Sequence, residues 1–139
     1  MSEQNKAVLR RFIEEVFNKG NTAAVDQLVA PDFVNHNPLP GATPDREGFK
    51  RGIAMLRAAF PGLHYIEEDM IAEGDKVVGK GVFRGTHLGE LMGIGPMGKQ
   101  VNLAGIAIFR VSGGKITARW ATLDMLGLMQ QLGVIPAQG

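Results

Sequence analysis

The 139-residue chain contains no cysteine, which excludes disulfides, thiolate metal ligands and a cysteine nucleophile. No cluster of basic residues could neutralise several phosphates, and 15 basic residues nearly balance 14 acidic ones, so we expect no nucleic-acid partner. No run of about 18 apolar residues could span a membrane, and the charged N-terminal segment is unlike a signal peptide. These absences favour one cytoplasmic domain over residues 1–139, with no membrane partner.

The first sixty residues predict three helices. Apolar residues recur at helical spacing from Glu3 to Lys19, and a second, shorter helix is expected from Thr22 to Val29. A turn-rich segment over 35–41 follows. Thr43 and Pro44 then have the residue types of a cap and a first helical position, and they open a third helix that ends at Pro61-Gly62.

After residue 62 the pattern changes to long strands. Gly74-Asp75 and Gly113-Gly114 are residue pairs typical of tight hairpin turns. The chain therefore predicts an α+β domain in which an antiparallel meander packs against the three N-terminal helices. The four expected strands are Leu63–Ala72, Val77–Arg84, Val101–Val111 and Lys115–Asp124.

Small residues inside these strands indicate how the sheet is shaped. Glycine inside a strand usually marks a bend or a close approach, so several together favour a strongly curved sheet with a pocket on its concave side. Tight packing of helices on the sheet is the alternative. The expected strand over 101–111 is apolar on both faces, which favours a homodimer through the outer sheet face over shielding by the chain's own loops. The small residues are Gly79, Gly81, Ala104, Gly105, Ala107, Ala118 and Ala121.

Several short segments, in order and spacing, resemble the SnoaL-like polyketide cyclase family. They are Pro31–His36, Gly85–Ile94, Gly114–Ile116, Trp120, Asp124 and Gln131–Gly133. The resemblance implies the cone-shaped α+β fold of the nuclear transport factor 2-like superfamily. It also implies intramolecular aldol ring closure without metal or cofactor, with an aspartate as general base.

The resemblance is incomplete where the chemistry is expected. The family's base corresponds to Ala121 here, and two polar side chains of the preceding strand correspond to Gly105 and Ala107. Asn35 and His87 match the family pattern. The aldol mechanism therefore does not transfer intact.

Asp124 is the remaining candidate for a base. Even spacing along a strand places it on the same face as Trp120. A carboxylate beside an indole in an apolar pocket would be desolvated, which raises its pKa and makes it a usable general base. The alternative is an N-cap for a short helix through Gly127 to Gln131.

Other candidates have both a functional and a structural interpretation. Asn35 and His36 could orient a carbonyl group at the pocket mouth, or could be there as turn residues. His87, Trp120, Tyr65 and Met92 are candidate substrate-binding residues, and Tyr65 could donate a hydrogen bond to an oxyanion. For His87, a structural role between glycines is the alternative, and for Met92 it is core filling.

Arg119 should point away from Trp120, where it could pair with a carboxylate, lie at an interface or enter the pocket as a cation. The three histidines show no metal-ligand spacing, so no metal is expected. Residues 93–98 match G-x-G-x-x-G, but a strand follows them instead of a helix. A nucleotide cofactor is therefore not expected, and this segment is a candidate flap over the pocket.

Two classes of function remain open. The first is an enzyme that performs cofactor-free acid–base chemistry (cyclisation, isomerisation or hydration) on a small, largely apolar carbonyl compound, with Asp124 as base. The second is a non-catalytic carrier of a small apolar ligand that has lost the base at position 121. A helix-binding interaction module is a more distant third.

Overall fold

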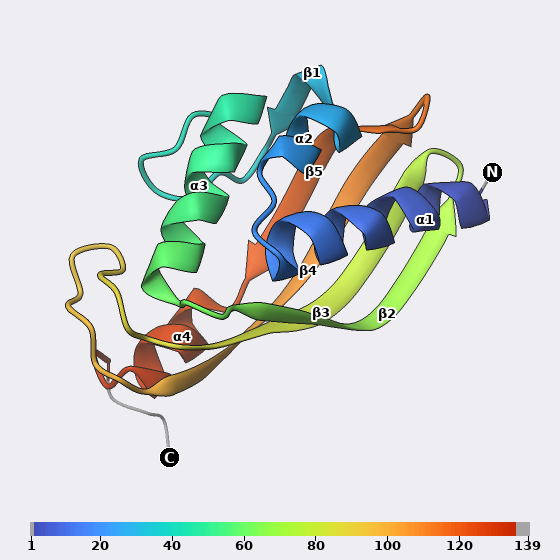
Figure 1. Cartoon of the computed structure of the whole chain (residues 1–139). Coiled ribbons are helices and arrows are strands. Elements are labelled where there is room, and N and C mark those ends of the chain that lie inside the picture. Colours follow the sequence, from blue (N-terminus) through green and yellow to red (C-terminus); the bar gives the residue numbers. More distant parts are fainter. Residues whose placement is uncertain (1, 136–139) are drawn as a thin grey trace.

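The structure, a computed structural model, describes residues 2–135. A curved five-stranded sheet carries helices on its concave face, and Figure 1 shows the N-terminal helices crossing the strands on that side. The α+β class and the three N-terminal helices are confirmed. The helices of this layer are α1 (Ser2–Phe12), which continues as a π-helical turn η1 (Ile13–Asn18), α2 (Ala23–Leu28) and α3 (Arg46–Ala59).

The sheet has the order β1-β5-β4-β3-β2. Its last four strands form the predicted antiparallel meander, and Gly74, Gly113 and Gly114 have positive φ at the two hairpin turns, as expected. The strands are β1 (Val29–Asn35), β2 (His64–Glu73), β3 (Lys76–Thr86), β4 (Gln100–Ser112) and β5 (Lys115–Leu123).

The first strand, β1, is absent from the sequence prediction, which assigned Val29 to a helix and left the following residues without a strand. The structure corrects this, because β1 pairs in parallel with β5 at the sheet edge. Pro31 lies between Val29 and Val34, where the register shifts, so its missing N–H disturbs no central ladder. This strand matters for the site, because it brings Asn35 beside Arg119.

The start of α3 also differs from the prediction. Asp45, and not Thr43, is the N-cap, and its carboxylate accepts a hydrogen bond from the backbone N–H of Gly48 at 2.8 Å. Thr43 instead donates to the Asp45 carboxylate at 2.6 Å. The prediction failed because both residue types cap helices well, and the choice between them depends on the backbone path after β1.

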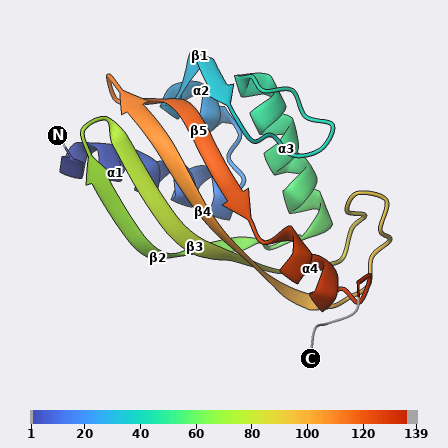
Figure 2. The ribbon, with the colours of Figure 1, turned by 180° about the vertical axis from the view of Figure 1, so that it is seen from behind.

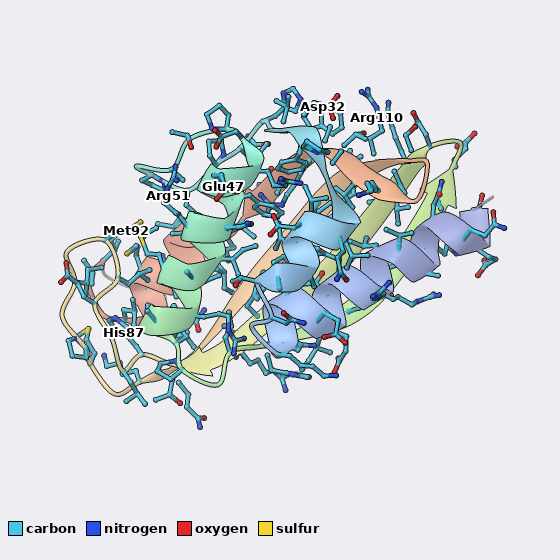
Figure 3. All side chains as sticks on the ribbon, turned by 45° about the horizontal axis from the view of Figure 1, so that its top comes forward. Asp32, Glu47, Arg51, His87, Met92 and Arg110 are labelled. Carbon is cyan, nitrogen blue, oxygen red and sulfur yellow. The ribbon has the colours of Figure 1, made fainter. Side chains whose placement is uncertain are left out.

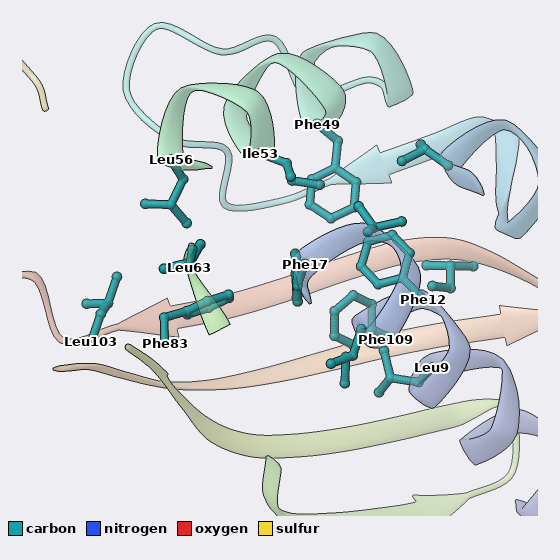
Figure 4. Packing of buried hydrophobic residues seen from close by; sticks show 14 of the residues in the cluster. Leu9, Phe12, Phe17, Phe49, Ile53, Leu56, Leu63, Phe83, Leu103 and Phe109 are labelled. Carbon is teal, nitrogen blue, oxygen red and sulfur yellow. The ribbon is translucent and has the colours of Figure 1, made fainter. Parts of the chain in front are cut away.

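Phenylalanine rings fill the space between the helices and the sheet, as Figure 4 shows. Phe12 stacks on Phe49 of α3 at a centroid distance of 5.6 Å, and Phe17 meets Phe83 of β3 edge-on at 5.0 Å. Phe109 of β4 lies 6.2 Å from Phe12. These rings join the helical layer to the sheet.

The convex face of the sheet is bare of helices among the described residues, apart from α4 (Met125–Gln131) at the end of β5 (Figure 2). Ile106 of β4 and Leu126 of α4 remain 53% and 58% exposed there. In residues 2–135 no helix is long and apolar enough to cross a membrane.

Candidate functional site

The main cavity lies between α3 and the β5 side of the sheet. It holds about 530 Å³ of space between protein atoms, part of it open to solvent. Its polar groups come from Asn35, Asn37 and Arg119, and none of its described lining residues is Asp, Glu or His. The apolar walls include Phe17, Phe49, Ile53, Leu56, Phe83 and Leu123.

Arg119 of β5 extends its guanidinium group into this apolar space. The residue is only 9% exposed, and Nη1 donates to the Asn35 side-chain oxygen at 3.4 Å. Phe49 and Phe109 lie on either side, with ring centroids 5.4 and 5.9 Å from the guanidinium carbon. The Nε–H group has no hydrogen-bond partner among the described residues. A cation is thus held in the cavity wall by neutral groups.

The charge state of Arg119 follows from its burial. Desolvation lowers the pKa of Arg119 from its ordinary 12.5 to about 10, while the nearby Tyr65 acts in the opposite direction. At neutral pH the side chain therefore remains a cation. A buried cation with an unused N–H donor favours an anion, or an oxygen atom that becomes anionic during a reaction.

A second, smaller space, the inner cavity, lies beyond Arg119 under α1 and η1. It is lined by Tyr65 and Ile13 and shares Arg119, Phe17 and other walls with the main cavity. Burial raises the pKa of Tyr65 to about 12, and Glu67 and Glu68 add to the rise. The phenol is therefore a hydrogen-bond donor at neutral pH.

The small residues of the strands lie in two kinds of surroundings. Ala121 lines the main cavity, and Gly79, Gly105 and Ala107 line the inner one. A Cβ at Gly81 would overlap the Tyr65 phenol, and one at Gly105 would overlap the Leu123 side chain, so these two glycines allow close packing.

Asn35 is the predicted catalytic residue that the structure places in the main cavity. It is 3% exposed, and its side-chain oxygen also accepts from the backbone N–H of Asn37 at 3.2 Å. The Asn37 side chain in turn accepts from the backbone N–H of Ala121 at 2.9 Å. These bonds fix the orientation of the Asn35 amide beside Arg119.

Asp124 occupies the helix-capping position that the sequence left open as the alternative to a base. Its carboxylate accepts a hydrogen bond from the Gly127 backbone N–H at 2.9 Å, at the start of α4. The residue is exposed and lines an open groove on the convex face, outside the main and inner cavities. The geometry gives no support for Asp124 as a base in the main cavity.

Trp120 and His36 also lie outside the two cavities. Their rings stack on each other with an interplanar angle of 5° and centroids 4.6 Å apart. The guanidinium carbon of Arg110 also lies over the indole, 5.5 Å from the ring centroid. This arrangement belongs to the convex face, because alternation along β5 directs Arg119 and Trp120 to opposite sides.

The loop between β3 and β4 contains the last two candidates, His87 and Met92 (Figure 3). His87 is fully buried against Phe60, and neither ring nitrogen has a hydrogen-bond partner among the described residues. Met92 lines a third, small pocket that shares Leu39 and Leu56 with the main cavity. Within residues 2–135, no three His, Asp or Glu side chains are grouped to hold a metal ion.

Arg119 is the functional candidate that the sequence did not commit to. Alternation along β5 correctly separated it from Trp120, but alternation cannot say which face is concave. A usable signal was present, since Arg119, Ala121 and Leu123 share one face, and two small or apolar neighbours beside a cation are unusual for a solvated surface.

Comparisons with known proteins agree on the family. The model of the family described as SnoaL-like polyketide cyclase matches residues 7–132. Nogalonic acid methyl ester cyclase of Streptomyces nogalater is 31% identical over 119 residues, spanning 84% of this chain and 89% of the relative. Aklanonic acid methyl ester cyclase AcmA of Streptomyces galilaeus is 32% identical over 135 residues, spanning 96% and 92%.

Solved structures show the same fold along nearly the whole chain. IdmH from Streptomyces antibioticus superposes with a TM-score of 0.83 at 31% identity, covering 94% of this chain and 99% of its own. TsrD from Streptomyces laurentii gives a TM-score of 0.86 at 26% identity, covering 96% and 97%. The expected cone-shaped fold is confirmed by these neighbours.

Proposed function

Because the chain belongs to the SnoaL-like polyketide cyclase family, we propose that it closes a ring in a small, largely apolar carbonyl compound held in the main cavity. The observation that carries this proposal is the buried Arg119 cation beside Asn35 in an otherwise apolar wall. The comparisons favour this activity over the non-catalytic carrier. Family chemistry of this kind needs no cofactor, and the proposal includes none.

The cavity would contribute in two ways. Its apolar walls would hold the substrate folded, so that the carbon nucleophile and the carbonyl carbon meet in a reactive geometry. Arg119 and Asn35 would stabilise the negative charge that develops on a carbonyl oxygen. At about 4 Å and an effective dielectric constant near 20, one unit charge stabilises another by about 4 kcal/mol. That is enough for a large rate effect without a side-chain base.

Site roles follow from this geometry as part of the proposal. Arg119 and Asn35 bind the reacting oxygen, and Tyr65 donates a hydrogen bond from the inner cavity. Asp124 and His36 are left out of the mechanism, because a helix cap and a stacked surface ring do not reach the cavity.

The test is turnover of the compounds that name the relatives. Purified protein is incubated with nogalonic acid methyl ester or aklanonic acid methyl ester, and ring closure is detected as a product of unchanged mass and new chromatographic retention. Arg119→Gln should lose the activity. Arg110→Gln, an arginine of the convex face, is the matched control and should keep it. Equal rates for the two variants would remove Arg119 from the mechanism.

We also propose that the convex face pairs with a second copy of the chain. Ile106 and Leu126 are large, apolar and more than half exposed there, and they border the same open groove. Sedimentation equilibrium tests this with Ile106→Glu, which should shift the protein toward monomer. Leu88→Glu, at a similarly exposed position in the loop between β3 and β4, is the control and should not.

The cytoplasmic location expected from the sequence stays a prediction. Fractionation of the producing cells, followed by immunodetection of the protein, checks it.

A further inference from the structure

The main cavity combines a cation with the absence of a base among its described lining residues. Arg119 donates Nη1–H to the neutral Asn35 amide, and its Nε–H is unpartnered. An aldol-type ring closure needs a carbon nucleophile, which forms when a C–H proton is lost. With no carboxylate or imidazole lining the cavity, that proton has no side-chain acceptor there.

Each element packed around Arg119 presents a neutral group to it. Asn35 comes from β1, Phe49 from α3 and Phe109 from β4. Tyr65 from β2 is the one titratable group among the described lining of the inner cavity, apart from Arg119 itself. Its pKa of about 12 keeps the phenol protonated at neutral pH, so it can donate a proton but cannot take one.

We propose that the substrate is a 1,3-dicarbonyl compound that occupies the cavity as its enolate anion, with the charged oxygens at Arg119. This inference rests on the proposed function and names its substrate class. A carbon between two carbonyl groups is acidic enough to ionise in water when a cation stabilises the anion, whereas a simple ketone is not. The planar guanidinium also matches two adjacent oxygens better than one.

The reaction balances without a further reagent. The C–H bond between the carbonyls breaks, its proton passes to water, and its electron pair delocalises over both oxygens beside Arg119. The central carbon then attacks a distant carbonyl carbon of the same molecule. A C–C bond forms, the attacked oxygen becomes an alkoxide, and a proton from water neutralises it. The product is an isomer of the substrate.

The experiment measures the ionisation of a bound probe. Benzoylacetone is a 1,3-diketone whose enolate and neutral forms differ in ultraviolet absorbance, and it is titrated with and without excess protein from about pH 6 to about pH 9, where Arg119 keeps its charge. We expect the bound probe to titrate at least about one pKa unit lower than the free probe, a tenfold preference for the enolate. Its 2,2-dimethyl derivative has no acidic C–H and should bind at least tenfold more weakly at the upper end of this range.

Variants assign the effect to Arg119. Arg119→Gln should abolish the pKa shift of the probe, and Arg110→Gln should retain it. Ala121→Asp places a carboxylate two residues along the same face of β5, which should neutralise Arg119 and also abolish the shift, while Ala121→Asn keeps it. The Asp substitution covers the case in which Arg119→Gln fails to fold.

Three results overturn the inference: no binding of benzoylacetone, an unshifted pKa in the native protein, or a shift that persists in both Arg119→Gln and Ala121→Asp. The outcome is separate from that of the proposed function. A shifted probe with no ring closure of the methyl esters leaves enolate binding intact and removes the cyclase reaction. Ring closure of the methyl esters with an unshifted pKa of the probe leaves the cyclase reaction intact and removes enolate binding.

Discussion

Arg119 and Trp120 are neighbours on β5 but lie on opposite faces of the sheet. The guanidinium of Arg119 enters the main cavity between Phe49 and Phe109, while the indole of Trp120 stacks on His36 outside it. One peptide unit therefore separates the cavity cation from the only tryptophan of the chain. This arrangement divides the candidate residues into a concave group that can meet a substrate and a convex group that cannot.

The position of Trp120 predicts that its fluorescence does not respond to a ligand bound in the main cavity. Because the indole lies outside the cavity, benzoylacetone bound at Arg119 should leave the wavelength of Trp120 emission unchanged, and Trp120→Phe should bind the probe with the native affinity. Fluorescence and isothermal titration calorimetry check the two statements. A shift of the emission maximum on binding, with weaker binding by Trp120→Phe, would place the ligand on the convex face.

The buried charge of Arg119 should lower the free energy of unfolding of the native protein. A pKa lowered from 12.5 to about 10 corresponds to about 3 kcal/mol of unfavourable burial at neutral pH. Arg119→Met keeps the length of the side chain without the charge, but it loses the contacts with Asn35 and the two rings. We therefore expect the free energy of unfolding to rise by about 1–2 kcal/mol at neutral pH, measured by urea denaturation.

The pH dependence provides a check on this cause. Between about pH 10 and pH 12.5 the unfolded chain keeps the Arg119 proton and the folded chain releases it, so this residue makes the native protein more stable as pH rises. Tyr65 has the opposite effect, because its raised pKa favours folding below about pH 10 and that contribution is lost toward pH 12. The native protein and Arg119→Met both contain Tyr65, so its effect cancels in their comparison. The excess free energy of unfolding of Arg119→Met over the native protein should therefore shrink above pH 10. A constant advantage would contradict desolvation as its cause.

Much of the fold could be predicted because local signals were consistent along the chain. Gly74 and Gly113-Gly114 adopt the positive φ that their hairpins need, and the strands between them alternate as strands do. The three helices followed from apolar spacing, although the π-helical turn Ile13–Asn18 did not. Residues 9, 12, 13, 16 and 17 are buried whether or not the helix widens there, so spacing carries no sign of it.

The candidate site was harder to predict because it depends on a contact between distant parts of the chain. Asn35 meets Arg119 only because β1 pairs with β5, and the Pro31 and Asn35 residue types favour turns over strands. Burial on the concave face, and not residue type, then separates Arg119 from Trp120. Asp124 has the residue type of both a base and a cap, and only the position of α4 decides between them.

Asp124 should matter for stability and not for the cavity. Asp124→Ala removes the cap of α4 and should lower the free energy of unfolding by about 1 kcal/mol, whereas Asp124→Asn retains a capping oxygen and should lose much less. Both variants should bind benzoylacetone like the native protein. Folded Asp124→Asn that has lost ring closure would show that the carboxylate takes part in the reaction after all.

Two glycines of β3, Gly79 and Gly81, lie near Tyr65, and substituting each by alanine tests how closely Tyr65 packs on this strand. A Cβ at Gly81 would overlap the Tyr65 hydroxyl and the Ile66 carbonyl oxygen, whereas a Cβ at Gly79 would meet Leu9 and the same hydroxyl at ordinary contact distances of 3.9 and 4.0 Å. Gly81→Ala should therefore lower the free energy of unfolding by about 1–3 kcal/mol. Gly79→Ala should be neutral or raise it by up to about 1 kcal/mol.

Tyr65 also reports directly on this displacement, because it is the only tyrosine of the chain. If Gly81→Ala pushes the phenol toward solvent, the pKa of Tyr65 should fall from about 12 toward its ordinary 10, while Gly79→Ala should leave it high. Tyrosinate absorbance, followed from about pH 9 upward while circular dichroism confirms folding, measures it. Identical titration curves for the two variants would mean that Gly81 is not what allows Tyr65 to lie against β3, and the inner cavity would then owe its shape to other residues.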